Sequence, residues 1–240
     1  MQSEALTPPP QFLTDANTIG FELTETELHR LGRYLHLLLE TNKQFNLTAI
    51  REPDLAWRRH ILESIAVVPA IGEARSLIDV GTGAGLPGLP IAILCPQLKV
   101  TLLEATGKKA RFIGSVCGDL GLKNVKIVTD RAETIAHQHE HRERYDLATA
   151  RAVGPMNVLL ELTLPLITPG GRLLAMKGQA AEQELRDAGD ALMLLGAGEV
   201  QVFELLPGLD DEANLIEVVK ESATPNQYPR RPGIPKQEPL

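Results

Sequence analysis

The hydrophobic and polar positions of the chain predict two helices ahead of a long stretch in which strands and helices alternate. Behind a capping box formed by Thr24 and Glu27, leucines recur at helical spacing at positions 28, 31, 35, 38 and 39. A second helical pattern runs from about residue 54 to residue 70, with Trp57 and Ile61 among its apolar positions. We expect these helices to form a cap over residues 21–72. Residues 1–20 are polar and contain prolines, so we expect a flexible N-terminus.

From residue 73 to residue 222, short apolar runs alternate with helical segments, which is typical of a parallel sheet with helices on both faces. The expected strands are Ser76–Val80, Val100–Glu104, Val125–Val128, Tyr145–Ala150, Arg172–Met176, Glu199–Leu205 and Leu215–Val219. Residues 206–214 are too few for a helical crossover, so the last two strands must be antiparallel neighbours. We therefore expect an α/β fold with a mostly parallel, Rossmann-like seven-stranded sheet and a C-terminal antiparallel hairpin. Residues 223–240 contain five prolines, which predicts a tail that is neither helix nor central strand.

The first expected strand runs directly into a glycine-rich loop, Asp79-Val80-Gly81-Thr82-Gly83-Ala84-Gly85-Leu86-Pro87-Gly88. Glycines at alternate positions let the backbone approach a ligand closely, and an apolar segment of helical length follows. Such a strand, loop and helix together indicate a site for a nucleotide-like cofactor.

Two classes of cofactor compete for this loop. The segment from Gly83 to Gly88 fits the dinucleotide fingerprint, and Glu104 lies near the ~20-residue offset of its ribose-binding acid. A carboxylate would repel a pyrophosphate, however, whereas Asp79 would attract the cationic sulfonium of S-adenosylmethionine. The acidic end of the strand therefore favours S-adenosylmethionine. The closing hairpin agrees, because it is what the sheet of class I S-adenosylmethionine-dependent methyltransferases looks like.

The carboxyl ends of the first two strands supply the candidate cofactor contacts, because ligands of such sheets bind at that edge. The first group would face the methionine moiety and the sulfonium: Asp79, Gly81, Gly83 and Gly85. The second strand ends in Glu104-Ala105-Thr106, where a carboxylate is suited to accept hydrogen bonds from both ribose hydroxyls.

The later strand ends supply further candidates. After the third strand, the backbone and carboxyl of Ala132 and Glu133 are suited to reading the adenine edge. Arg151 ends the fourth strand, where it is placed for the methionine carboxylate or the substrate, and Lys177 ends the fifth.

Composition and charge limit the classes of protein. The chain has 43% hydrophobic residues and a formal net charge of -7, which argues against a simple nucleic-acid-coating protein. No apolar run approaches the ~18 residues of a membrane span, and no signal peptide is apparent, so we expect a cytoplasmic protein. Cys95 and Cys117 exclude a disulfide framework. His137, His139 and His141 alternate like metal ligands but lie among charges, so we expect solvated surface and no metal. We expect a monomer.

Basic residues are nevertheless grouped locally, which bears on RNA as a partner. The three clusters are Arg51, Arg58 and Arg59; the six lysines and arginines between Lys99 and Lys126; and Arg230, Arg231 and Lys236. Each cluster alone is more often a solvated face than a binding patch. Holding RNA phosphates against the overall negative field would require the clusters to share one surface.

Five segments together identify a resemblance to a known family. They are Asn46-Leu47-Thr48, Arg59-His60-Ile61-Leu62-Glu63-Ser64, the glycine loop from Asp79 to Gly88, Ala150-Arg151-Ala152 and Met176-Lys177-Gly178. In this order they resemble the ribosomal RNA small-subunit methyltransferase G family, also called glucose-inhibited division protein B, over roughly residues 24–220. The resemblance implies S-adenosylmethionine as cofactor and methyl transfer to N7 of guanosine 527 in the 16S rRNA of the small ribosomal subunit.

The resemblance also implies which residues form the site. Cofactor contacts fall on Gly81, Leu86, Glu104-Ala105-Thr106, Ala132-Glu133 and Arg151, of which only Leu86 is absent from the strand-end candidates. Guanine N7 carries no proton to be removed, so no general base is required. Our hypothesis is that five residues position a flipped-out guanine and its neighbouring phosphates: Arg151, Asn46, Arg59, His60 and Lys177. Two alternatives remain open, an NAD-dependent oxidoreductase and a non-catalytic S-adenosylmethionine-binding ribosome-assembly factor.

Overall fold

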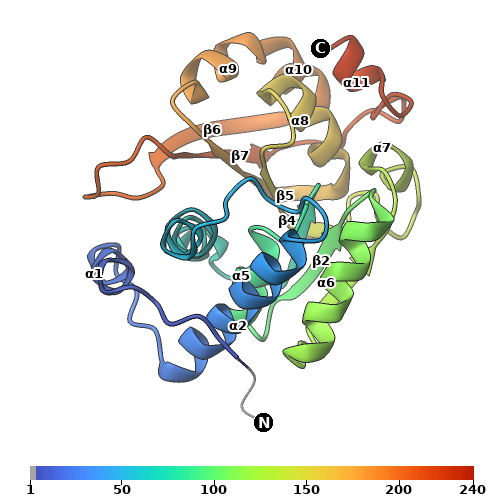
Figure 1. The fold of residues 1–240 in the computed structure, drawn as a ribbon. Helices are drawn as coiled ribbons and strands as arrows, with labels where there is room; N and C mark the ends of the chain where they lie inside the picture. The colour runs from blue at the N-terminus through green and yellow to red at the C-terminus, as the bar shows by residue number, and fades with distance from the viewer. Residues whose placement is uncertain (1–3) are drawn as a thin grey trace.

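The centre of the protein is a seven-stranded sheet in the order β3-β2-β1-β4-β5-β7-β6. A computed structural model describes residues 4–240 (Figure 1). The strands are β1 (Ser76–Val80), β2 (Lys99–Leu103), β3 (Val125–Val128), β4 (Tyr145–Arg151), β5 (Ile167–Lys177), β6 (Ala197–Glu204) and β7 (Asn214–Lys220). The first five strands run parallel, and β7 pairs antiparallel with both β5 and β6. The expected strands and closing hairpin are thus confirmed, although β5 begins five residues earlier than expected.

Helices cover both faces of the sheet (Figure 1). The α-helices are α1 (Pro10–Thr18), α2 (Glu25–Asn42), α3 (Pro53–Ala56), α4 (Glu63–Ile65), α5 (Gly88–Leu94), α6 (Gly107–Asp119), α7 (Ala132–Ile135), α8 (Met156–Thr163), α9 (Ala181–Asp187), α10 (Gly189–Leu195) and α11 (Ile234–Gln237). A π-helix spans Trp57–Leu62, and 3₁₀ turns span Val68–Ile71 and Leu164–Leu166. One apolar core joins the cap helices to α5 and α6, and a second lies between the sheet and α7 to α10.

The N-terminal cap is tied to the glycine loop. Thr24 and Glu27 form the expected capping box at the start of α2. On the buried face of that helix, the Tyr34 hydroxyl donates a hydrogen bond to the carbonyl of Ala84, 3.0 Å away. The expected second helix is divided into α3, a π-helical turn, α4 and a 3₁₀ turn. Trp57 is fully buried, as its apolar position predicted.

The expectation of a flexible N-terminus is wrong for the described part of residues 1–20, and residues 1–3 lie outside the described residues. Pro10 occupies the first turn of α1, where its missing N–H costs nothing. The Phe12 ring packs on Trp57 with 4.6 Å between ring centroids. Asp15 is buried and forms an ion pair with Arg58 at 2.8 Å. Each of these two contacts joins residues more than 40 positions apart in the sequence, so no local pattern could predict them.

The histidine segment also differs from its expectation. His141 is buried, and its Nδ1 atom lies 2.6 Å from the Tyr145 hydroxyl, while the His137 ring lies 2.8 Å from the Pro229 carbonyl oxygen. The expectation of solvated surface is therefore wrong for His141. Within residues 4–240, no group of three or more histidine, cysteine, aspartate or glutamate side chains is placed to hold a metal ion. Over the same residues, no helix has the length and apolar character needed to cross a membrane.

Candidate active site

The glycine loop leaves β1 at the point where the chain order reverses between β1 and its neighbours β2 and β4. The N–H groups of Gly81 and Thr82 both donate to the Leu103 carbonyl at the end of β2. Gly81, Gly83 and Gly85 have φ angles of 69°, 62° and 100°, in the left-handed region that favours glycine. The loop therefore sits where open α/β sheets bind ligands.

The space around the loop fits a closely approaching ligand. A Cβ atom added to Gly83 would meet only the Gly81 carbonyl, 3.9 Å away, so the backbone there borders open space. The Glu104 carboxylate accepts hydrogen bonds from the N–H groups of Gly83 at 3.0 Å and Thr106 at 2.7 Å. Each carboxylate oxygen retains lone pairs, so Glu104 keeps acceptor capacity for hydroxyl groups. Ala105 and Thr106 are exposed beside it, and Leu86 is half-buried at the far end of the loop.

Asp79 has a different position from the expected one. Its side chain is fully buried and accepts hydrogen bonds from the Thr82 hydroxyl, the Gly88 N–H at 2.9 Å and the Thr149 hydroxyl at 3.2 Å. Burial raises the pKa of this carboxyl to about 6, against the effect of those three donors. Its Oδ2 atom holds the loop at Thr82 and the first turn of α5 at Gly88, while Oδ1 holds Thr149 on β4. The structure therefore gives Asp79 a role in holding the loop, and its direct contact with the cofactor stays a prediction.

Glu133 and Ala132 begin α7, next to the C-terminal tail. Both are buried, and the Glu133 carboxylate accepts a hydrogen bond from the Gly233 N–H at 3.0 Å. Glu133, together with Val153 and Lys236, borders a cavity of about 360 Å³. The candidate adenine-reading residues are thus covered by a segment from the far end of the chain.

Arg151, at the carboxyl end of β4, joins the glycine loop to a larger cavity of about 580 Å³. The next residue, Ala152, has a φ of +55°, a strained backbone for a residue with a side chain. This turn places Val153 against the glycine loop, since a Cβ on Gly81 would lie 3.0 Å from the Val153 methyl group. Arg151, Arg59 and Lys177 all line the cavity. The structure therefore brings together three of the five predicted substrate-positioning residues.

Glu63, which the sequence did not single out as a site residue, lies between the two arginines. One of its oxygens is 2.8 Å from the Arg59 guanidinium and the other is 3.1 Å from that of Arg151. Arg151 also donates to the Arg59 carbonyl, 2.6 Å away in the π-helical turn. Burial raises the pKa of the Glu63 carboxyl, while Arg151 and then Arg59 oppose that shift. Glu63 thus holds both guanidinium groups at one wall of the cavity.

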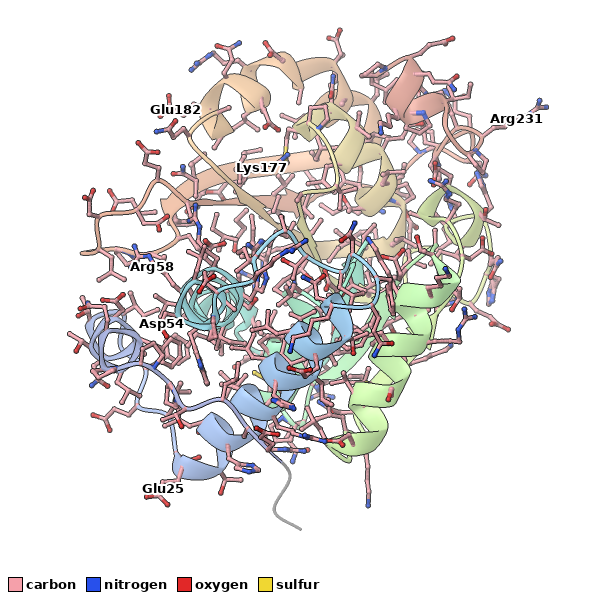
Figure 2. The ribbon with its side chains drawn as sticks, in the orientation of Figure 1. Glu25, Asp54, Arg58, Lys177, Glu182 and Arg231 are labelled. Carbon is pink, nitrogen blue, oxygen red and sulfur yellow. The ribbon has the colours of Figure 1, made fainter. Side chains whose placement is uncertain are left out.

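Lys177 is fixed at the end of β5. Its ammonium donates to the Gly154 carbonyl and the Glu184 carboxylate, each 2.6 Å away. Figure 2 shows this lysine within the body of the molecule, at the sheet, rather than among the side chains that extend from its surface. Glu184 is thus a second acidic residue of the cavity that the sequence did not reveal.

His60 and Asn46 do not join this cavity. His60 is buried, with its Nε2 atom 2.8 Å from the Thr48 hydroxyl and its Nδ1 atom without a partner among the described residues. Asn46 is exposed and lines a separate cavity with Arg51. His60 thus lies apart from the lining of this cavity and supports the loop that carries Asn46, because the same loop contains Thr48. Its contact with substrate stays a prediction.

Burial, and then the positive charge of Arg151, lower the pKa of His60 to about 4. The unfolded chain takes up this proton near its usual pKa of about 6.5. We therefore expect the His60 contribution to stability to be fully present above pH 6.5 and to be lost as the pH falls to 4. Urea unfolding at pH 7 and pH 5 should show a smaller acid destabilisation for His60→Gln than for the wild-type protein. Equal losses in the two proteins would contradict the buried, neutral imidazole.

The reversed last strand, the glycine loop at the switch point and the acidic residue at the end of β2 together define a class I methyltransferase. The fold is similar to that of an O-methyltransferase from Bacillus cereus solved with SAH, which is 20% identical with a TM-score of 0.58. That match covers 88% of this chain and 96% of the other. A SAM-dependent O-methyltransferase from Thermotoga maritima is 18% identical with a TM-score of 0.51, over 78% of this chain and 72% of the other.

The sequence model of the family described as rRNA small subunit methyltransferase G matches residues 27–212. Ribosomal RNA small subunit methyltransferase G of Leuconostoc citreum is 46% identical over 95% of this chain and 98% of its own length. The protein of that name from Alkaliphilus metalliredigens is 38% identical over 92% of this chain and 94% of its own. The chain belongs to this family. The expected fold class, family and S-adenosylmethionine cofactor are thereby confirmed, and the NAD-dependent alternative is set aside.

Proposed function

We propose that this protein transfers a methyl group from S-adenosylmethionine to N7 of guanosine 527 in 16S rRNA. The relatives named above carry the rRNA small subunit in their names, and the sequence resemblance implies the particular atom. The observation that carries the proposal is the position of Arg151, whose neighbouring turn contacts the glycine loop while its guanidinium lines the larger cavity. Because the substrate is ribosomal RNA, we expect the enzyme to act in the cytoplasm.

The charge of the larger cavity suits a nucleic acid. Four cationic side chains, Arg59, Arg151, Lys177 and Lys236, line it against the two carboxylates of Glu63 and Glu184. This local excess of positive charge contrasts with the formal net charge of -7 for the whole chain. Phosphate binding is strengthened by such a cluster, whereas the acidic remainder of the surface discourages indiscriminate binding to RNA.

The residues of the cavity meet the chemical needs of N7 methylation. Guanine N7 offers a lone pair and has no proton to lose, so no side chain has to act as a base. Gly81, Gly83 and Glu104 would hold S-adenosylmethionine at the glycine loop, where it would supply a methyl group on a positively charged sulfur. Arg151 and Lys177 then need only hold the base and its phosphates in line with that loop. Such positioning can contribute about 7–11 kcal/mol to catalysis.

The proposal is tested by methyl transfer to natural particles. Small ribosomal subunits from a strain that lacks this enzyme would be incubated with tritiated S-adenosylmethionine, with naked 16S rRNA in parallel. We expect one tritiated methyl group per subunit, recovered as N7-methylguanosine at position 527. Label at another base or atom would refute the assigned target. Binding of S-adenosylmethionine without any transfer to subunits or RNA would support the non-catalytic assembly factor instead.

A further inference from the structure

The C-terminal tail, residues 223–240, is folded onto the domain, beside α7 and α8 (Figure 1). Arg230 forms an ion pair at 2.6 Å with Glu161, whose side chain is fully buried in α8. Arg142 donates to the carbonyl oxygens of Thr224 and Tyr228, and Tyr228 itself is buried. The tail also contains a short helix, α11, so the expectation that it holds no helix is wrong. Pro235 lies within the first turn of α11, where proline is tolerated.

This anchoring brings one tail residue to the candidate active site. The Gly233 N–H is bonded to Glu133, and Lys236 follows three residues later in α11. Lys236 lines both cavities, the smaller one beside Glu133 and the larger one beside Arg151. The tail is therefore a wall that the two cavities share, and Lys236 stands where they meet.

Lys236 differs in its charge balance from the other cations of the larger cavity. Arg59 and Arg151 are paired with Glu63, and Lys177 is paired with Glu184. Over residues 4–240, the Lys236 ammonium forms neither an ion pair nor a hydrogen bond, and the residue is exposed. An anion that enters the cavity meets three cations that already contact a carboxylate and one, Lys236, that contacts none.

We propose that Lys236 is an RNA-binding residue that contacts a backbone phosphate at the mouth of the larger cavity. The proposal rests on the proposed function, because it assigns part of the substrate site of that enzyme. The position of Lys236 supports the proposal as well as its charge. The hydrogen bond from Gly233 to Glu133 fixes the start of α11, and hence Lys236, relative to the candidate adenine-binding end of the site. The proline-rich tail thus belongs to the substrate-binding surface.

The test measures binding of the full-length protein to unmethylated small ribosomal subunits at several KCl concentrations. Lys236→Ala is compared with Lys236→Arg and with Arg231→Ala. Arg231 is the matched control, because it is an exposed cation of the same tail that extends away from the molecule (Figure 2). For Lys236→Ala we expect the slope of log K against log salt to become shallower by about 0.7–0.9, the loss of one phosphate contact. We expect Lys236→Arg and Arg231→Ala to keep the wild-type slope.

Two results would overturn the assignment of Lys236. One is a wild-type slope for Lys236→Ala. The other is an equal change for Lys236→Ala and Arg231→Ala, which would indicate only the general charge of the tail. The thermal shift produced by S-adenosylmethionine should be the same in all four proteins, so a loss of RNA binding is separated from a loss of cofactor binding. Failure of the proposed function is distinguishable, because the wild-type protein itself would then neither bind nor methylate the subunits.

Discussion

Arg151→Ala is expected to lower kcat/KM for methyl transfer by at least about 100-fold while the protein remains folded. The side chain lines the larger cavity, and the turn that follows it packs against Gly81 of the glycine loop. Its loss removes a cation from the proposed guanosine site and leaves Glu63 with only Arg59 as a partner. Steady-state kinetics with small ribosomal subunits would measure the effect, with thermal unfolding to verify the fold.

Arg172→Ala is the matched control for this substitution. Like Arg151, Arg172 pairs with a glutamate, Glu217, at 2.7 Å, and donates to a backbone carbonyl, that of Ile71. Arg151 pairs with Met176 of β5, near the edge of the sheet where the parallel strands end. Arg172 lies on the same strand four residues before Met176, and is therefore away from that edge. Both variants should lose comparable stability, but only Arg151→Ala should lose activity. Comparable activity in the two variants would remove Arg151 from the site.

Gly83→Ala is expected to weaken binding of S-adenosylmethionine with little further change in the protein. The added methyl group borders open space within the protein, so the folded state bears only the cost of a left-handed φ, about 1–2 kcal/mol. A cofactor lying against this backbone would meet the methyl group, at a cost of about 1–3 kcal/mol. That corresponds to a roughly 5- to 150-fold rise in Kd, measurable by isothermal titration calorimetry.

Gly121→Ala separates the strain from the ligand effect. Gly121 has a φ of 61°, close to the 62° of Gly83. An added Cβ would meet nothing within 4 Å at Gly121 and only the Gly81 carbonyl, 3.9 Å away, at Gly83. It lies in the turn after α6, outside the candidate site. The two variants should therefore unfold at similar temperatures while only Gly83→Ala loses affinity. If both bound S-adenosylmethionine as tightly as the wild-type protein, the glycine loop would not be where the cofactor lies.

The parts of the fold that local sequence encodes were predicted well. Strands β1 and β3 match their expected bounds, because each is a short apolar run with clear turn residues beside it. The start of β5 was missed because Pro169 and two glycines read as a turn, whereas they lie in an irregular stretch where β5 pairs with Tyr145 across a bulge. The folded N-terminus and the short helix of the tail were missed for another reason. Their stability comes from partners such as Arg58 and Glu161, which are distant in the sequence.

The candidate site likewise contains residues that the sequence pattern placed correctly and residues whose positions depend on distant contacts. The placement of strand-end residues such as Glu104 and Arg151 at one edge of the sheet was predicted correctly, because the topology of a parallel sheet brings those ends together. The sequence revealed the acidic end of β1 but not the direction of the Asp79 side chain, which depends on Thr149 in another strand. The sequence showed Glu63 only as part of a family segment and Lys236 only as part of a basic cluster. Neither pattern says that the side chain lines a cavity with Arg151, because that depends on contacts distant in the sequence.

The position of Glu63 between two guanidinium groups has a consequence for how the enzyme selects among cellular polyanions. Glu63 acts as a counter-ion that Arg59 and Arg151 share, so both guanidinium groups are already oriented and partly balanced before any RNA arrives. A phosphate that displaces the Glu63 carboxylate gains little binding free energy, because one anion is exchanged for another at the same two guanidinium groups. We therefore expect this wall of the cavity to favour a strand whose shape supplies further contacts in the pocket over an arbitrary polyanion.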